Sequence, residues 1–177
     1  MNDLDDLIRD LQRAGSKFKD LHSSLPEIFG TVAVNFTRDN FKRQGFTENG
    51  SLNRWEKRVP GSPRDEGRSV LIDRENLKDS IRKWVISSEQ VQVGVDSTKV
   101  PYAKIQNEGG TIKVTPKMKK FFWAQFYQTG DPFWKRMALM KKKEIDIPKR
   151  QWIGMTPDLQ KAIFRAITVR VKQILKD

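Results

Sequence analysis

The sequence of 177 residues contains no cysteine and only one histidine, His22. The lack of cysteine excludes disulfides, thiol nucleophiles and zinc sites with cysteine ligands, and it is typical of proteins from reducing compartments. His22 lies in a polar stretch with no catalytic motif beside it, so we interpret it as a surface residue. The sequence also lacks the motifs of phosphate-binding loops, serine hydrolases and zinc proteases. We therefore expect that the protein is not an enzyme and binds no cofactor.

The sequence also shows no group of acidic residues in a pattern typical of metal ligands. A metal-dependent nuclease needs several carboxylates that meet as ligands of the ion. The acidic groups present here fall at expected helix starts, where capping and the helix dipole account for them: Asp3, Asp5 and Asp6, and then Asp73, Glu75 and Asp79. The sequence therefore predicts neither a catalytic site nor a metal site.

Long apolar runs are missing as well. No stretch approaches the roughly 20 apolar residues that a membrane-spanning helix needs. The first residues, MNDLDDLIRDLQRAG, are acidic and amphipathic, unlike the basic start and apolar centre of a signal peptide. We therefore expect no secretion and no membrane partner. A chain of this length is most simply one domain, long enough to bury a core without disulfides or metals.

Positive charge, by contrast, is present in excess, with a net charge of +12. Residues 111–151 contain eleven Lys and Arg residues against three Asp and Glu residues. Such a surface attracts polyanions, and its affinity for them falls steeply as salt rises. The charge pattern alone does not decide between a basic face that is simply solvated and one that faces DNA. The candidates for this face are Lys117, Lys119, Lys120, Lys141, Lys142 and Lys143.

Aromatic residues are interleaved with these lysines in KMKKFFWAQFYQTGDPFWKRMALMKKK. Base stacking would require exposed aromatic faces beside lysines directed at phosphates. Seven aromatics between residues 121 and 134, however, are more apolar surface than a soluble monomer normally exposes. We expect part of them in the core and part in an interface between subunits. The candidate interface residues in this stretch are Phe121, Phe122, Trp123, Phe126, Phe133 and Trp134.

Apolar residues recur at helical spacing at the start of the chain. Gly15 is a candidate interruption, and a second helix is expected at residues 24–27, which form an S-x-x-E capping box with Pro26 in the first turn. The following TVAVNFT run is rich in β-branched residues and also allows a strand, but the cap and the spacing favour a helix. The N-terminal stripe, which packs in the core or docks on a neighbouring subunit, comprises Leu4, Leu7, Ile8, Leu11, Phe18 and Leu21.

Gly, Pro and charged residues replace this periodicity in residues 45–69, which predicts a long loop. Such loops in compact domains are uncommon unless they bind something or are disordered. Trp55 is the exception within it, and an indole there either anchors the loop to the core or contacts a partner. We favour the anchor and keep Trp55 as a candidate interface residue.

The rest of the chain mixes short strands and helices. A short helix is expected from Asp73 to Ile81, and another near Tyr102 that ends at Gly109. Longer helices are expected from Pro116, and from Thr156, whose Thr-Pro-Asp sequence supplies a cap, a first-turn proline and an acid. Strands are expected at residues 84–86, 91–95, 111–115, 144–147 and 151–155.

Together these elements predict an α+β domain of residues 1–177. A small mixed or mainly antiparallel sheet is expected to be covered on one face by long N- and C-terminal helices. Its parts would be a helical segment, residues 1–44, the Gly/Pro-rich loop, residues 45–69, and an α+β core, residues 70–177.

Three short motifs occur in a fixed order in the second half of the chain. Residues 91–94 read V-x-V-G, residues 102–105 read Tyr-Ala-x-Ile before two glycines, and residues 148–154 read Pro-x-Arg-x-Trp-Ile-Gly before the last helix. Their order and spacing resemble the phage virion morphogenesis family, the tail-completion proteins of Mu-like phages and their prophage relatives. With Trp55 and residues 71–81, the resemblance covers about residues 25–177.

Two positions depart from this family pattern. The chain has Arg74-Glu75 where relatives usually have Thr-Gly, and Gln106-Asn107 where many have His-Gln. A histidine-dependent role of that turn is therefore not expected, and a structural one is. The matching residues to which the resemblance assigns a structural role are Tyr102, Gly109, Gly110, Pro148, Arg150, Trp152 and Gly154.

This resemblance implies a non-enzymatic virion protein that acts in tail completion, as a tail terminator or as a neck protein. Subunits would form a ring, such as a hexamer, in the host cytoplasm and then join the tail tube and head-tail connector around the DNA channel. The ring interface is expected on sheet edges, terminal helices and residues 121–134, with the loop at residues 44–69 ordering on a partner. The alternative is a free-standing basic protein that binds nucleic acid, and a nuclease is a distant third.

Overall fold

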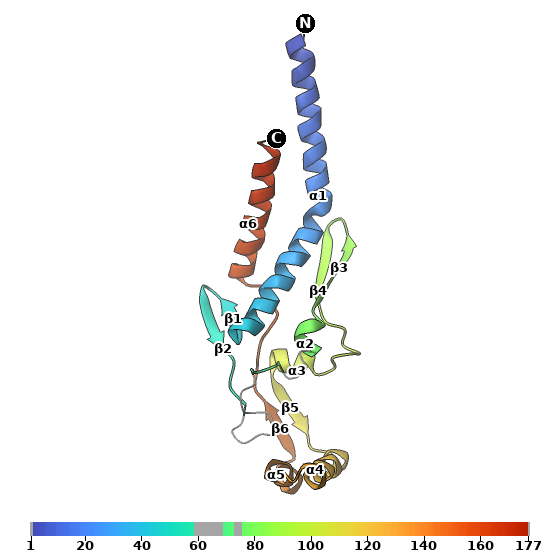
Figure 1. The fold of residues 1–177 in the computed structure, drawn as a ribbon, viewed down its shortest axis with the longest axis vertical. Coiled ribbons are helices and arrows are strands. Elements are labelled where there is room, and N and C mark those ends of the chain that lie inside the picture. The colour runs from blue at the N-terminus through green and yellow to red at the C-terminus, as the bar shows by residue number, and fades with distance from the viewer. Residues whose placement is uncertain (1, 59–68, 73–75, 177) are drawn as a thin grey trace.

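The computed structural model describes residues 2–58, 69–72 and 76–176, and the predicted cap Asp73 and most of the predicted loop after residue 58 lie outside them. The described residues form an elongated α+β fold, which confirms the predicted class (Figure 1). Its helices are α1 (Asn2–Arg43), α2 (Asn76–Asp79), α3 (Ala103–Glu108), α4 (Pro116–Thr129), α5 (Pro132–Leu139) and α6 (Pro157–Ile174). Its strands are β1 (Gly45–Glu48), β2 (Ser51–Arg54), β3 (Arg82–Ser87), β4 (Gln90–Gly94), β5 (Gly110–Lys113) and β6 (Glu144–Ile147).

The N-terminal segment is one helix of 42 residues, so the prediction of two helices is wrong. Gly15 and Pro26 both lie inside α1, and the Ser24 hydroxyl donates to the Leu21 carbonyl at 2.8 Å instead of capping a new helix. A proline inside a helix costs about 3 kcal/mol and bends it. Figure 1 shows the axis of α1 changing direction partway along its length. Packing of α1 on α6 and on β3 and β4 offsets the cost of keeping the helix intact.

Residues 45–54 form a hairpin where a loop was predicted. β1 and β2 pair antiparallel, with Gly45 opposite Arg54, and the turn between them is Asn49-Gly50. Both turn residues have positive φ, 53° and 75°, as a type I′ turn requires. The Asn-Gly pair is the sequence signal that the loop prediction overlooked, because the flanking residues are mostly polar.

The other strands form two further antiparallel pairs, β3 with β4 and β5 with β6. The hairpin predicted around residues 84–95 is confirmed, and so is the strand at residues 144–147. The strand predicted at residues 151–155 is wrong, because these residues adopt no regular secondary structure. Within the described residues, the strands therefore form three separate pairs rather than one sheet.

The core lies where the C-terminal half of α1 meets the middle of the chain. Phe41 and Ile81 are fully buried, and Leu77 of α2 is 2% exposed. None of the clustered core residues belongs to α4, α5 or the first half of α1. The cluster consists of Val34, Phe41, Trp55, Leu77, Ile81, Val100, Ala103 and Trp152.

The last helix, α6, begins as predicted. The Thr156 side chain accepts a hydrogen bond from the Leu159 N–H at 3.2 Å, with Pro157 and Asp158 in the first turn. α6 packs beside α1 and runs in the opposite direction, and the N-terminal end of α1 extends past the end of α6 (Figure 1). In the described residues, no helix combines the length and the apolar character needed to cross a membrane.

Candidate assembly surfaces

The motif residues after β6 fasten three segments that are distant in sequence. The Arg150 Nε donates to the Glu56 carbonyl at 2.9 Å, and its terminal nitrogens reach the Lys57 carbonyl at 3.4 Å and the Gln106 side chain at 3.5 Å. The Arg150 main-chain N–H donates to the Gln106 carbonyl at 2.8 Å. Burial lowers the pKa of Arg150, although a guanidinium stays charged in proteins. Arg150 therefore links the segment after β2 to α3.

Asn107 supplies the matching contact from α3. Its Oδ1 accepts hydrogen bonds from the main-chain N–H groups of Trp152, at 3.0 Å, and Ile153, at 3.1 Å. The Trp152 indole N–H donates to the Ala103 carbonyl at 3.3 Å, and its ring is 3% exposed. In this chain the turn is thus held by the Asn107 side-chain amide.

The glycines of the motifs allow close approach of the backbone. Gly109 ends α3 at φ 75°, and a Cβ built there would lie 2.9 Å from the main-chain N of Lys149. A Cβ on Gly154 would lie 2.7 Å from the Gln151 side chain. Of the remaining motif residues, Gly110 begins β5, Pro148 is half-buried, and Tyr102 is 42% exposed. These contacts join α3 to the segments that follow β2 and β6.

Trp55 belongs to the core rather than to the surface. Its ring is 7% exposed and meets Phe41 edge-to-face at 5.3 Å between centroids. The indole N–H donates to the Gln151 carbonyl at 2.7 Å. Trp55 is therefore the anchor of the segment after β2, and it is unavailable as an interface residue while this contact holds.

The helices α4 and α5 form what we call the aromatic hairpin, residues 116–139. The Thr115 side chain caps α4 by accepting from the Met118 N–H, and Asp131 caps α5 by accepting from the Phe133 N–H at 2.8 Å. Gly130, at φ 70°, ends α4 and donates its N–H to the Phe126 carbonyl. The two helices pack on each other at the end of the molecule far from both termini (Figure 1).

The aromatic side chains of this hairpin form two groups. In one, the Trp134 ring lies 6.0 Å from those of Phe121 and Phe122 and 5.2 Å from that of Phe133. In the other, Trp123, Phe126 and Tyr127 meet at 5.8 to 6.0 Å. Only Phe122 among them is buried. Phe122 is buried at 7% exposure, as expected for part of this stretch, but it packs in a small cluster separate from the one around Phe41.

This cluster leaves apolar surface uncovered. Phe121 is 53% exposed, Tyr127 79% and Leu139 59%, while Trp123, Phe126, Phe133 and Trp134 are half-buried. Lys135 lies over the Phe126 ring, with its Nζ 5.7 Å from the ring centroid. The aromatic hairpin therefore exposes an apolar surface that is flanked by basic side chains.

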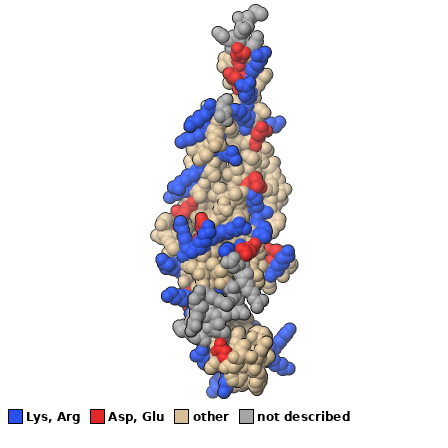
Figure 2. Space-filling model, viewed as in Figure 1, with Lys and Arg blue, Asp and Glu red and all other residues tan. Residues whose placement is uncertain are grey.

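Five of the six candidate lysines are exposed, and one is not. Lys119 is half-buried and its Nζ donates to the Met140 carbonyl at 3.1 Å, so it ties α4 to the end of α5. The visible face in Figure 2 shows lysine and arginine side chains along the whole length of the molecule, some of them at the hairpin end. The exposed candidates are Lys117, Lys120, Lys141, Lys142 and Lys143.

Large apolar side chains are also exposed on three other elements. β3 exposes Trp84, Val85 and Ile86 by 41 to 55% beside its unpaired edge. The first turns of α1 and one side of α6 add further residues, up to 71% exposed at Phe164. The sequence predicted an interface on the terminal helices but did not single out Phe164 or Val169 of α6.

The described residues contain no cluster of candidate metal ligands. No three His, Asp or Glu side chains gather there in a way that could hold a metal ion. His22 is exposed in the middle of α1. Large apolar side chains are thus exposed on the aromatic hairpin, on the β3 edge and on parts of α1 and α6.

No protein-family model, curated protein or solved structure matches this chain. The resemblance to phage tail-completion proteins therefore stays a prediction from the motifs.

Proposed function

We propose that this protein is a non-enzymatic structural subunit that assembles with copies of itself into a ring. The observation that carries this proposal is the number of large apolar side chains exposed on separate elements, among them Leu4 on α1, Val85 on β3, Phe121 on α4 and Phe164 on α6. Soluble monomers rarely leave such surface uncovered. Because the exposed patches differ from one another, they suit a heterologous contact, which closes into a ring when the rotation between subunits allows it.

The motif resemblance supports a particular place for such a ring, at the head-proximal end of a phage tail. A tail-completion or neck protein there joins the tail tube to the head connector around the DNA. A conduit for DNA needs diffuse positive charge without base readout, because passage must not stall on specific contacts. The spread of lysine and arginine seen in Figure 2 suits that requirement.

Native mass is the direct test of self-assembly. Across a dilution series in sedimentation velocity and native mass spectrometry, we expect one closed oligomer of defined size in exchange with monomer. Electron microscopy of that species should show a ring with a central opening. A monomer that persists to high concentration would overturn the proposal of self-assembly.

One observation favours nucleic-acid binding as a second candidate. The aromatic hairpin exposes Tyr127 and is followed by the exposed residues Lys141, Lys142 and Lys143. Aromatic faces beside phosphate-directed lysines bind single strands without sequence preference. The same groups would also serve a ring that faces DNA.

A salt titration of DNA binding separates the two functions. If the protein acts as a structural ring, dilute monomer should bind a short duplex or single strand weakly in fluorescence anisotropy. A free-standing binder would bind tightly, with a log-log slope near −0.9 per neutralised phosphate in duplex. Replacing Lys141, Lys142 and Lys143 with Gln would then lower that slope by about three. Tyr127→Ala is the matched variant for stacking.

A further inference from the structure

The first turns of α1 form an exposed helical arm, residues 2–18. Leu4 is 66% exposed, Leu7 55% and Leu11 64%, whereas Leu25, Ile28 and Val32, three heptads further along the helix, are half-buried. The stripe has a coiled-coil repeat, with Leu4, Leu11 and Phe18 seven residues apart and Leu7 three after Leu4. Later turns of the same helix pack on α6, so the arm continues an existing interface beyond the end of α6 (Figure 1).

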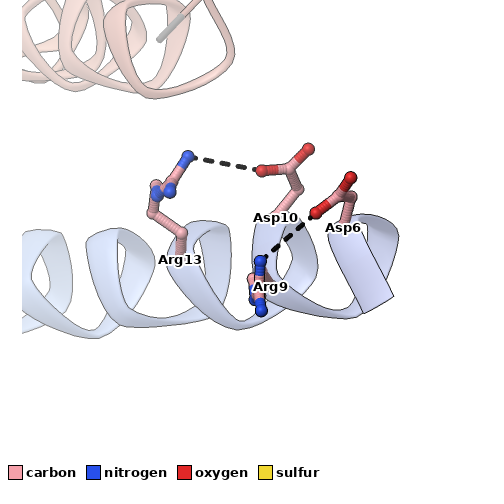
Figure 3. Close-up of polar contacts among 4 residues, drawn as sticks. All are labelled: Asp6, Arg9, Asp10 and Arg13. Carbon is pink, nitrogen blue, oxygen red and sulfur yellow. Dashed lines mark hydrogen bonds and ion pairs between the residues drawn. The ribbon is translucent and has the colours of Figure 1, made fainter. Parts of the chain in front are cut away.

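This arm is the acidic exception in a basic protein. Four aspartates, at positions 3, 5, 6 and 10, face three basic residues, Arg9, Arg13 and Lys17, which gives the arm a net charge of −1. Asp6 pairs with Arg9 and Asp10 with Arg13, each at 3.3 Å, in succession along the helix (Figure 3). Both pairs are exposed, with side-chain exposures of 64 to 72%, and such pairs contribute little to stability. Their carboxylates therefore remain accessible to a cationic partner.

α6 carries a second uncovered stripe with the opposite charge. Phe164 and Leu175 are each 71% exposed, and Val171 between them is half-buried. Spacings of seven and four residues place these three on one side of the helix, which we call the outer face of α6. Lys161 and Lys172 border this face and are exposed. A shallow hollow around Phe164 is lined by Gln160, Lys161, Phe164 and Arg165.

We infer that the arm of one copy packs on the outer face of α6 in the next copy. Each partner has an apolar stripe with seven-residue spacing, and the acidic flank of one suits the basic flank of the other. Their lengths also agree, at about 25 Å for the arm and about 27 Å for α6. The contact would cover two apolar surfaces that are exposed in the single chain.

The contact must join two copies rather than close within one. α1 is a continuous helix that already packs along another side of its own α6, and its first turns extend past the end of α6 (Figure 1). The arm therefore does not reach the outer face of its own α6. Two arms pairing with each other would bring their aspartates together, which opposes that alternative. The resulting contact is heterologous, and this inference rests on the proposed self-assembly.

Two full-length variants test the contact from each side. The arm variant carries Leu4→Gln and Leu11→Gln, and the face variant carries Phe164→Gln and Leu175→Gln. Glutamine retains helix propensity and removes the apolar contact, and all four positions are exposed, so circular dichroism and Tm should be unchanged. Val169→Gln is the matched control, because Val169 is 56% exposed on α6 but lies about 140° around the helix from Phe164.

Sedimentation velocity of each variant, and of an equimolar mixture, gives the answer. Each variant alone should show a dissociation constant raised at least about tenfold, and the control none. The mixture should form a dimer with one copy of each and nothing larger, because only one intact arm meets one intact outer face. If the face variant assembles like the wild type, or if the mixture stays monomeric, the inference is overturned while wild-type assembly still supports the proposed function. A wild type that never assembles would instead overturn the proposed function itself.

Discussion

Replacing Trp152 with alanine is expected to lower the free energy of unfolding by about 3–5 kcal/mol. Trp152 is 3% exposed, its ring centroid lies 6.0 Å from that of Phe41, and its indole N–H donates to the Ala103 carbonyl at 3.3 Å. The substitution opens a cavity in the core and also leaves that carbonyl without its donor. Since domains are stable by only about 5–15 kcal/mol, much of the folding free energy would be lost.

Urea denaturation followed by circular dichroism measures this effect. Met155→Ala is the control, because Met155 is close in sequence but 69% exposed, and it should change the free energy by less than about 0.5 kcal/mol. If Trp152→Ala does not fold, Trp152→Phe provides the smaller step and should lie between the wild type and the alanine variant. Equal stability of wild type and Trp152→Phe would contradict the assigned packing and hydrogen bond.

Replacing Trp55 with alanine is expected to cost a similar amount, about 3–5 kcal/mol, in the monomer itself. Its ring is 7% exposed against Phe41, and its N–H reaches the Gln151 carbonyl at 2.7 Å. An interface residue would behave differently, since its loss weakens assembly and leaves the monomer stable. The experiment therefore decides between the two roles that the sequence leaves open for this tryptophan.

The measurement is denaturation at a concentration where sedimentation shows only monomer. Tyr127→Ala is the matched aromatic control, because Tyr127 is 79% exposed and its removal should leave monomer stability nearly unchanged. Trp55→Phe keeps a ring but deletes the N–H, and should cost about 1–3 kcal/mol. If the denaturation midpoint of Trp55→Ala equals that of the wild type while its assembly is weakened, Trp55 is an interface residue and not a core anchor.

Elements with strong local signals were predicted correctly. The Thr-Pro-Asp start of α6, the hairpin β3–β4 and the glycine end of α3 each depend on residues within a few positions of one another. Pro26 shows the opposite case, because local rules start a new helix there, whereas packing on α6 and on the β3–β4 hairpin holds α1 together as one helix. The missed β1–β2 hairpin had a local signal in Asn49-Gly50, without the apolar alternation that usually accompanies it.

The candidate surfaces depended more heavily on the fold. Trp55 and the aromatics of α4 look alike in sequence, yet the first is buried against Phe41 and Phe121 remains exposed in a separate cluster. Lys119 was indistinguishable from its neighbours until its contact with the Met140 carbonyl placed it between two helices. Such differences arise from contacts between residues far apart in the chain.

The sequence by itself determined the absence of thiol chemistry, the excess of positive charge, the helices at both ends of the chain and the Thr156 cap of α6. These depend on composition and on neighbours along the chain. Tertiary structure decided which strands pair, where the core lies, and that the stripe of α1 is covered near Val34 but uncovered near Leu4. The physical reason is that an amphipathic stripe has the same pattern whether it faces its own core or another molecule, so only the position of α6 shows which part is left exposed.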